Sequence, residues 1–168
     1  MTFIGTVLAI ACIVLGALAV WVSGQRHGEQ FVIARGHARN VLSYEFAGSP
    51  ARLRELVASS GDRGREALLR CLDIDYYIMA GYVVVGIGAA GVLTAVSQPG
   101  LARFVIIATL LAALFDTIEN AAIRQAVRTH PSGGSTAPIA TAAAAVKFAL
   151  LAAAVAAVLL WPWRAWFG

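Results

Sequence analysis

Four long apolar runs occupy most of this sequence and constrain its fold more than any other feature. They cover residues 3–23, 74–96, 101–127 and 138–161, and each holds at most a few ionisable side chains. At 1.5 Å per residue, a helical run of about 20 residues crosses a hydrocarbon core of about 30 Å. The pattern therefore predicts an all-α integral membrane protein, in which four transmembrane helices form a single membrane domain.

The composition supports membrane spans. The chain is 60% hydrophobic and 13% charged, whereas a soluble domain is about 25% charged. This balance excludes a soluble enzyme, a nucleic-acid-binding module and a disordered tail. A secretory signal is the rival interpretation of the first run. Such a signal begins with a basic region, and no lysine or arginine precedes Arg26, so we interpret the run as a retained span.

The arginines predict the orientation of the spans. Ten lie in the two loops that follow the first and third runs, and two, Arg103 and Arg164, flank the opposite side. Because cytoplasmic loops carry the excess of basic residues, we predict both termini outside and both basic loops in the cytoplasm. Arginine outnumbers lysine twelve to one, as GC-rich bacterial genomes favour, so the predicted location is a bacterial plasma membrane.

The loop of residues 24–73 is predicted to be helical rather than a plain linker. Apolar residues recur at helical spacing over 31–46 while arginines occupy other faces, which is typical of an interfacial amphipathic helix. Ser49-Pro50 opens a second short helix that ends near Gly61, and the chain then runs without a break into the second span. We expect both helices to lie on the membrane surface, with the arginines against anionic lipid headgroups and no nucleic-acid partner.

Ionisable side chains inside the spans are the most informative feature for function, because charges are costly in a bilayer. The third span places Asp116, Glu119 and Asn120 at positions i, i+3 and i+4, on one helical face. The fourth span holds the one lysine of the chain, Lys147. Asp116 and Lys147 lie about 15 and 14 Å from the cytoplasmic ends of their helices, so we expect them to pair.

The start of the second span adds two aspartates and two tyrosines. Asp73 and Asp75 are about 200° apart around a helix, so only one of them can face the bundle interior. Asp73 shares its face with Tyr77 and with glycines that permit close helix contact, and it is predicted to point inward. Asp75 is then expected to face the headgroups, and Tyr82 to lie deeper, near the other polar residues.

The polar residues of the last three spans are predicted to converge in the cytoplasmic half of one bundle. They are Asp73, Tyr77, Asp116, Glu119, Asn120 and Lys147. Three carboxylates and one amine cannot all be ionised at low cost in a low dielectric, so at least one acid is expected to hold a proton. A general acid or a proton relay requires such a group. The set offers only hard oxygen ligands, which suit Mg²⁺ or Ca²⁺ better than zinc, and we predict neither a metal nor a cofactor.

Three functions fit this pattern. In the first, Asp116 and Glu119 act as acid or base on a lipid-like ligand, an isoprenoid or acyl chain, in an isomerisation or cyclisation, and the other four residues bind the ligand or balance charge. The second is a non-catalytic accessory subunit, whose ridges of small residues suit a partner membrane protein or a second copy of the chain. The third is a proton- or cation-coupled transporter with the carboxylates as a relay. A purely structural ion pair that sets the helix register is the remaining interpretation.

Overall fold

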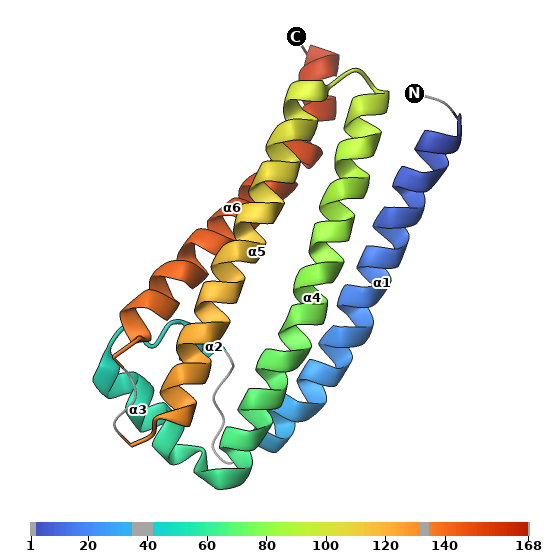
Figure 1. The fold of residues 1–168 in the computed structure, drawn as a ribbon. Coiled ribbons are helices and arrows are strands. Elements are labelled where there is room, and N and C mark those ends of the chain that lie inside the picture. Colours follow the sequence, from blue (N-terminus) through green and yellow to red (C-terminus); the bar gives the residue numbers. More distant parts are fainter. Residues whose placement is uncertain (1–2, 35–41, 132–134, 168) are drawn as a thin grey trace.

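The computed structural model describes residues 3–34, 42–131 and 135–167, and the regular structure in these ranges is all helical (Figure 1). In chain order the helices are α1 (Phe3–Ala34), α2 (Leu42–Glu45), α3 (Pro50–Ser59), α4 (Gly61–Ala95), α5 (Pro99–Arg128) and α6 (Ala137–Phe167). Four of them, α1, α4, α5 and α6, are long and apolar enough to cross a membrane. The predicted all-α architecture with four membrane-spanning helices is confirmed.

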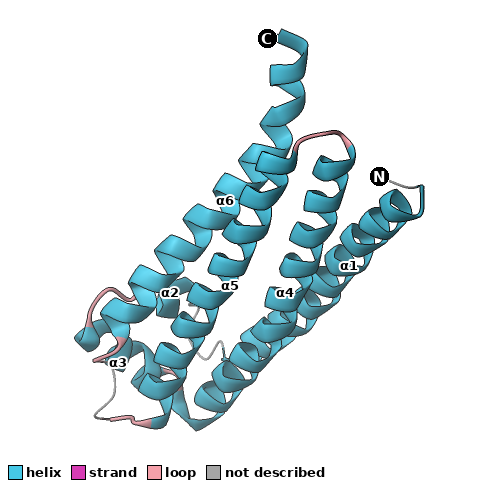
Figure 2. Ribbon diagram, turned by 45° about the horizontal axis from the view of Figure 1, so that its top comes forward, coloured by secondary structure: helices cyan, strands magenta, loops and turns pink. Residues whose placement is uncertain are grey.

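The four long helices follow one another in space in the order α1, α4, α5, α6 (Figures 1 and 2). Helix α4 packs against α1 on one side and α5 on the other, and α5 packs in turn against α6. The two ends of the chain lie at one end of the bundle, and α3 lies at the other (Figure 1). The two short helices therefore sit at the end of the bundle away from both termini.

Small residues bring α1 and α4 into backbone contact. A Cβ atom on Gly16 would lie 2.6 Å from the carbonyl oxygen of Gly81, and one on Gly88 would lie 2.6 Å from the carbonyl oxygen of Ala9. No larger side chain fits at either glycine without moving the backbone opposite. Because lipid chains are as apolar as leucine, helices in a membrane associate through such close van der Waals packing. The glycine face of α4 therefore packs against α1.

Helix α3 begins as the sequence predicts. The hydroxyl of Ser49 accepts a hydrogen bond from the backbone N–H of Arg52 at 3.3 Å, which caps the first turn ahead of Pro50. Its position differs from the expected surface location. Leu53 and Leu56 are fully buried in a core with residues of α4, α5 and α6, so α3 closes the end of the bundle.

The predicted amphipathic helix over 31–46 is divided in the structure. Its first part belongs to α1, which continues as far as Ala34, well past the predicted end of the first span. Residues 35–41 lie outside the described residues. The last part forms the single turn α2 and ends at Glu45. From Gly61 the chain runs as one helix to Ala95, as expected.

Candidate functional site

A buried cluster of charges is centred on Lys147 of α6. Its Nζ atom lies 3.0 Å from Oδ1 of Asp116 and 2.8 Å from Oε2 of Glu119, both on α5. As whole residues, Asp116, Glu119 and Asn120 are 2% exposed or less, and Lys147 is 5% exposed. The predicted convergence of these four residues is therefore present, and so is the pairing of Lys147 with Asp116.

Helix α4 supplies two further polar groups to this cluster. The hydroxyl of Tyr82 donates a hydrogen bond to Oδ2 of Asp116 at 3.0 Å. The side-chain amide of Asn120 donates to Oδ2 of Asp75 at 2.8 Å. Because Asp75 and Tyr82 are seven residues apart, they lie two turns apart on one face of α4, and that face is the one turned towards α5.

The prediction that Asp73 points inward and Asp75 outward is wrong. The side chain of Asp73 is 64% exposed and pairs with Arg124 at 2.6 Å, at the rim of the bundle. Tyr77, predicted to bind a ligand, is 67% exposed and is not brought into the cluster. The prediction assumed that the glycine face of α4, which Asp73 and Tyr77 share, is the face turned towards the other polar residues. In the structure that face packs against α1, whereas the acids of the cluster lie on α5.

Glu45 is a member of the cluster that the sequence analysis missed. It comes from α2, outside the long helices, yet it is buried, and its Oε2 lies 4.0 Å from Nζ of Lys147. Burial raises the pKa of Glu45 above its ordinary value, and the positive charge of Lys147 opposes that shift. In the sequence Glu45 is one polar residue in an amphipathic stretch, and no local pattern distinguishes it from its exposed neighbours.

The cluster holds more carboxyl groups than cations. Glu45, Asp116 and Glu119 all contact Lys147, which is the one cation that touches them within the described part of the chain. Two carboxylates about 4 Å apart repel by about 4 kcal/mol at an effective dielectric of about 20. Ionisation of all three acids beside one ammonium group is therefore costly. The described residues contain no group of three or more acidic, histidine or cysteine side chains arranged to hold a metal ion.

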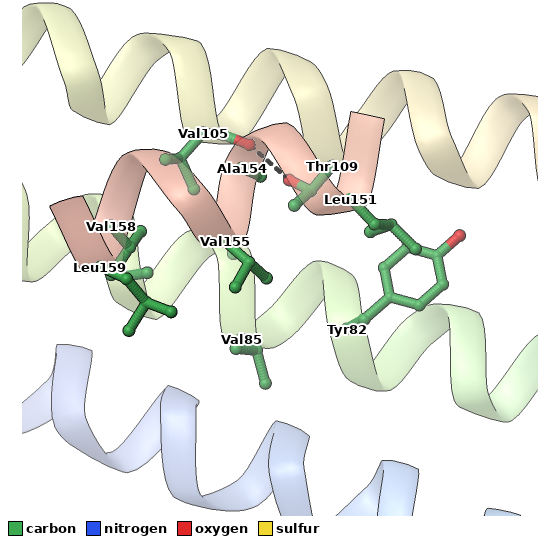
Figure 3. A pocket seen from close by; sticks show the side chains of 11 residues that line it. Tyr82, Val85, Val105, Thr109, Leu151, Ala154, Val155, Val158 and Leu159 are labelled. Carbon is green, nitrogen blue, oxygen red and sulfur yellow. Dashed lines mark hydrogen bonds between the residues drawn. The ribbon is translucent and has the colours of Figure 1, made fainter. Parts of the chain in front are cut away.

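An apolar groove begins at the Tyr82 side of the cluster (Figure 3). It has a volume of about 200 Å³ and lies between α4 and α6, with Val105 and Thr109 of α5 as its floor. Val155 and Leu159 line it and are more than half exposed, so the groove opens to the outside of the bundle, where lipid would lie. The hydroxyl of Thr109 bonds to backbone carbonyls of its own helix, as the dashed line in Figure 3 shows for Val105.

Tyr82 is thus the side chain that joins the groove to the charged cluster. It lines the groove, whereas Asp116 and Glu119 do not, and its hydroxyl reaches Asp116. Lys147 of α6 in turn contacts both acids. The arrangement connects an apolar surface to a buried group of proton donors and acceptors through one phenol.

Comparisons with known proteins add no relative to this picture. No protein-family model, curated protein or solved structure matches the chain.

Proposed function

We propose that the protein binds a lipid-like molecule, an isoprenoid or acyl chain, in the groove between α4 and α6. The observation that carries this proposal is that Tyr82 both lines the groove and donates a hydrogen bond to Asp116. The apolar part of the ligand lies along Val105 and Val155, and its polar end meets the phenol. At about 200 Å³ the groove is smaller than a typical ligand pocket of about 300–1,000 Å³. The groove therefore holds only part of the ligand, and the rest of the ligand's hydrocarbon chain stays in the bilayer.

The same geometry supports acid–base chemistry on the bound molecule. Tyr82 is the group that touches the ligand, and Asp116 is the acceptor behind it that takes or returns the phenolic proton. Lys147 stabilises the carboxylate form of Asp116, and Glu119 balances the charge of Lys147. In this proposal Asp116 and Glu119 are positioning and proton-holding residues, because neither lines the groove.

The proposed setting is a cell membrane with the α3 end on the cytoplasmic side. The arginine excess supports this orientation, since α3 and the first turns of α4 carry Arg52, Arg54, Arg63, Arg65 and Arg70. Arg54 and Arg63 are exposed at this end, where anionic headgroups would meet them. The ligand is then reached from the cytoplasmic leaflet.

Native mass spectrometry of the protein, extracted in lipid particles and then stripped of bulk lipid, tests the binding proposal. We expect one defined lipid to remain on the wild type and to be lost from Ala89→Leu, which fills the groove. Ala80→Leu is the matched control, because it adds the same side chain to an exposed position of α4 outside the groove. Tyr82→Phe is expected to lower retention about fivefold, since it removes one hydrogen bond of about 1 kcal/mol.

Two results would contradict the proposal. One is a wild-type protein that retains only bulk membrane lipid, and the other is an Ala89→Leu variant that keeps the same lipid as the wild type. A stoichiometric second protein in the spectrum would instead favour the accessory-subunit function. In that case Asp116→Asn and Glu119→Gln are expected to lower the amount of the complex, whereas in a catalyst they abolish turnover at an unchanged membrane level.

A further inference from the structure

Helix α2 is held against α6 by contacts that direct Glu45 into the bundle. The hydroxyl of Thr141 accepts a hydrogen bond from the backbone N–H of Gly48 at 3.0 Å and donates one to the carbonyl oxygen of Glu45 at 2.9 Å. The ring of Phe46 stacks on that of Phe148, with centroids 6.0 Å apart. The chain from Glu45 to Gly48 is therefore fixed to α6, and the carboxyl group of Glu45 points towards Lys147.

Glu45 meets a second acid in this position. Oε2 of Glu45 and Oε2 of Glu119 lie 4.0 Å and 2.8 Å from the same Nζ atom of Lys147, so the two carboxyl groups are neighbours, and Glu119 is fully buried. Oε2 of Glu45 and Oε1 of Glu119 have no hydrogen-bond partner among the described residues. Two carboxylates cannot bond to each other, because both are acceptors only, whereas one shared proton supplies the missing donor.

The surrounding charges do not remove this need for a proton. Lys147 faces Glu45 and Glu119 from α6, but it also pairs with Asp116, so one ammonium is divided among three carboxyl groups. Asp116 faces the pair from the same helix as Glu119 and adds negative charge. On α4, Asp75 is bonded to Asn120 and supplies no donor to the pair.

We infer that Glu45 and Glu119 form a proton-binding site, in which one shared proton holds α2 on the end of the bundle. When that proton leaves to water, two carboxylates are left in contact beneath α2. Their repulsion releases α2 and uncovers Glu119 and Lys147 to the aqueous side. The ligand of this site is a proton from water, and the inference does not depend on a lipid in the groove.

Carbon-13 NMR of the full chain in lipid nanodiscs tests the site directly, because the chain contains only five glutamates to label at the side-chain carboxyl carbon. Near neutral pH we expect the signals of Glu45 and Glu119 to report a shared proton and to titrate together. Glu55 and Glu66 are exposed partners of arginines and serve as internal references for ionised carboxylates. Ionised signals from both Glu45 and Glu119 near neutral pH would overturn the inference.

The variant Glu45→Gln distinguishes a proton shared between Glu45 and Glu119 from a proton that Glu119 holds only because it is buried. A glutamine amide donates a hydrogen bond, so Glu119 no longer needs a proton, and its signal should move to that of an ionised carboxylate. The control Glu55→Gln, at an exposed position of α3, should leave the signal of Glu119 unchanged. A protonated Glu119 that is insensitive to Glu45→Gln would refute the pair. If the variant does not fold, the joint titration in the wild type decides alone.

Discussion

Nζ of Lys147 lies 3.0 Å from Oδ1 of Asp116, although the two residues are 31 positions apart and sit on different membrane-spanning helices. Because α5 and α6 run in opposite directions, this contact requires that both residues lie at the same depth. It therefore fixes the register of α6 against α5. The same lysine contacts Glu119 and Glu45, so one side chain ties three elements together.

The variant Lys147→Met is expected to destabilise the protein by about 3–5 kcal/mol, because removal of one partner leaves buried carboxylates without a counter-charge. The measurement is reversible unfolding in mixed micelles. Arg70→Met is the control, since Arg70 pairs with Glu66 at 2.5 Å on an exposed surface of α4, where such pairs contribute about 0–1 kcal/mol. Equal effects of the two substitutions would show that Lys147 is not structurally important.

The double variant Lys147→Met with Asp116→Leu is expected to recover only part of the lost stability. Glu119 is the reason, because it also lies 2.8 Å from the lysine and stays fully buried without a cation. The amount of folded protein in the membrane provides the measurement. Full recovery of both abundance and lipid retention would mean that the charges serve the helix register alone, and the site proposed around Tyr82 would have to be abandoned.

The part of the site on α5 and α6 could be predicted from the sequence. Asp116, Glu119 and Asn120 share a helical face by their spacing alone, and the helical rise per residue places Lys147 opposite Asp116. This reasoning works because the ends of both spans are marked by turn residues. The four spans themselves follow from the length of the apolar runs.

The position of Tyr82 near the polar residues was also predicted and is confirmed by its hydrogen bond to Asp116, whereas the contributions of Glu45 on α2 and Asp75 on α4 could not be predicted in the same way. Glu45 is brought into the cluster by Thr141, which lies 96 positions away, and no periodicity encodes such a contact. For Asp73 and Asp75 the helical geometry correctly allowed only one to face inward. The choice between them depended on which helix occupies the glycine face of α4, and that is a property of the packed bundle.

Gly16→Ala is expected to weaken the contact between α1 and α4 by about 1–3 kcal/mol, the usual cost of overpacking. A Cβ atom at this position would lie 2.6 Å from a backbone oxygen, which cannot move as a side chain can. Gly24→Ala is the matched control on the same helix, because a Cβ atom there meets nothing within 4 Å. Unfolding in mixed micelles measures both variants, and equal stabilities would contradict the packing described for α1.

Thr141→Val is expected to loosen α2 by about 0.5–1.5 kcal/mol for each hydrogen bond that it removes, because the N–H of Gly48 and the carbonyl of Glu45 lose their common partner. Hydrogen exchange at the Gly48 amide is the measurement. Thr94→Val serves as the control, since the hydroxyl of Thr94 bonds only to a carbonyl of its own helix at 2.8 Å. Unchanged protection of Gly48 in Thr141→Val would show that other contacts hold α2.

The docking of α2 is expected to weaken as the pH rises. Burial raises the pKa of Glu45 above its ordinary value of 4.5, so the docked form binds the proton more tightly than the undocked form. Well below pH 4.5 both forms are protonated and docking is at its strongest. Between 4.5 and the raised pKa, docking loses about 1.4 kcal/mol for each pH unit, and above that pKa the loss is complete.

Hydrogen exchange of the Phe46 and Gly48 amides, which are bonded to Leu42 and Thr141, measures this dependence after correction for the intrinsic effect of pH. Protection should fall across the window in the wild type and stay level in Glu45→Gln, because a neutral side chain has no proton to lose. Glu55→Gln changes an exposed acid on α3, so it should retain the wild-type slope. Protection that rises with pH would reverse the sign of the linkage, and it would mean that Glu45 docks as a carboxylate paired with Lys147 rather than as a protonated acid beside Glu119.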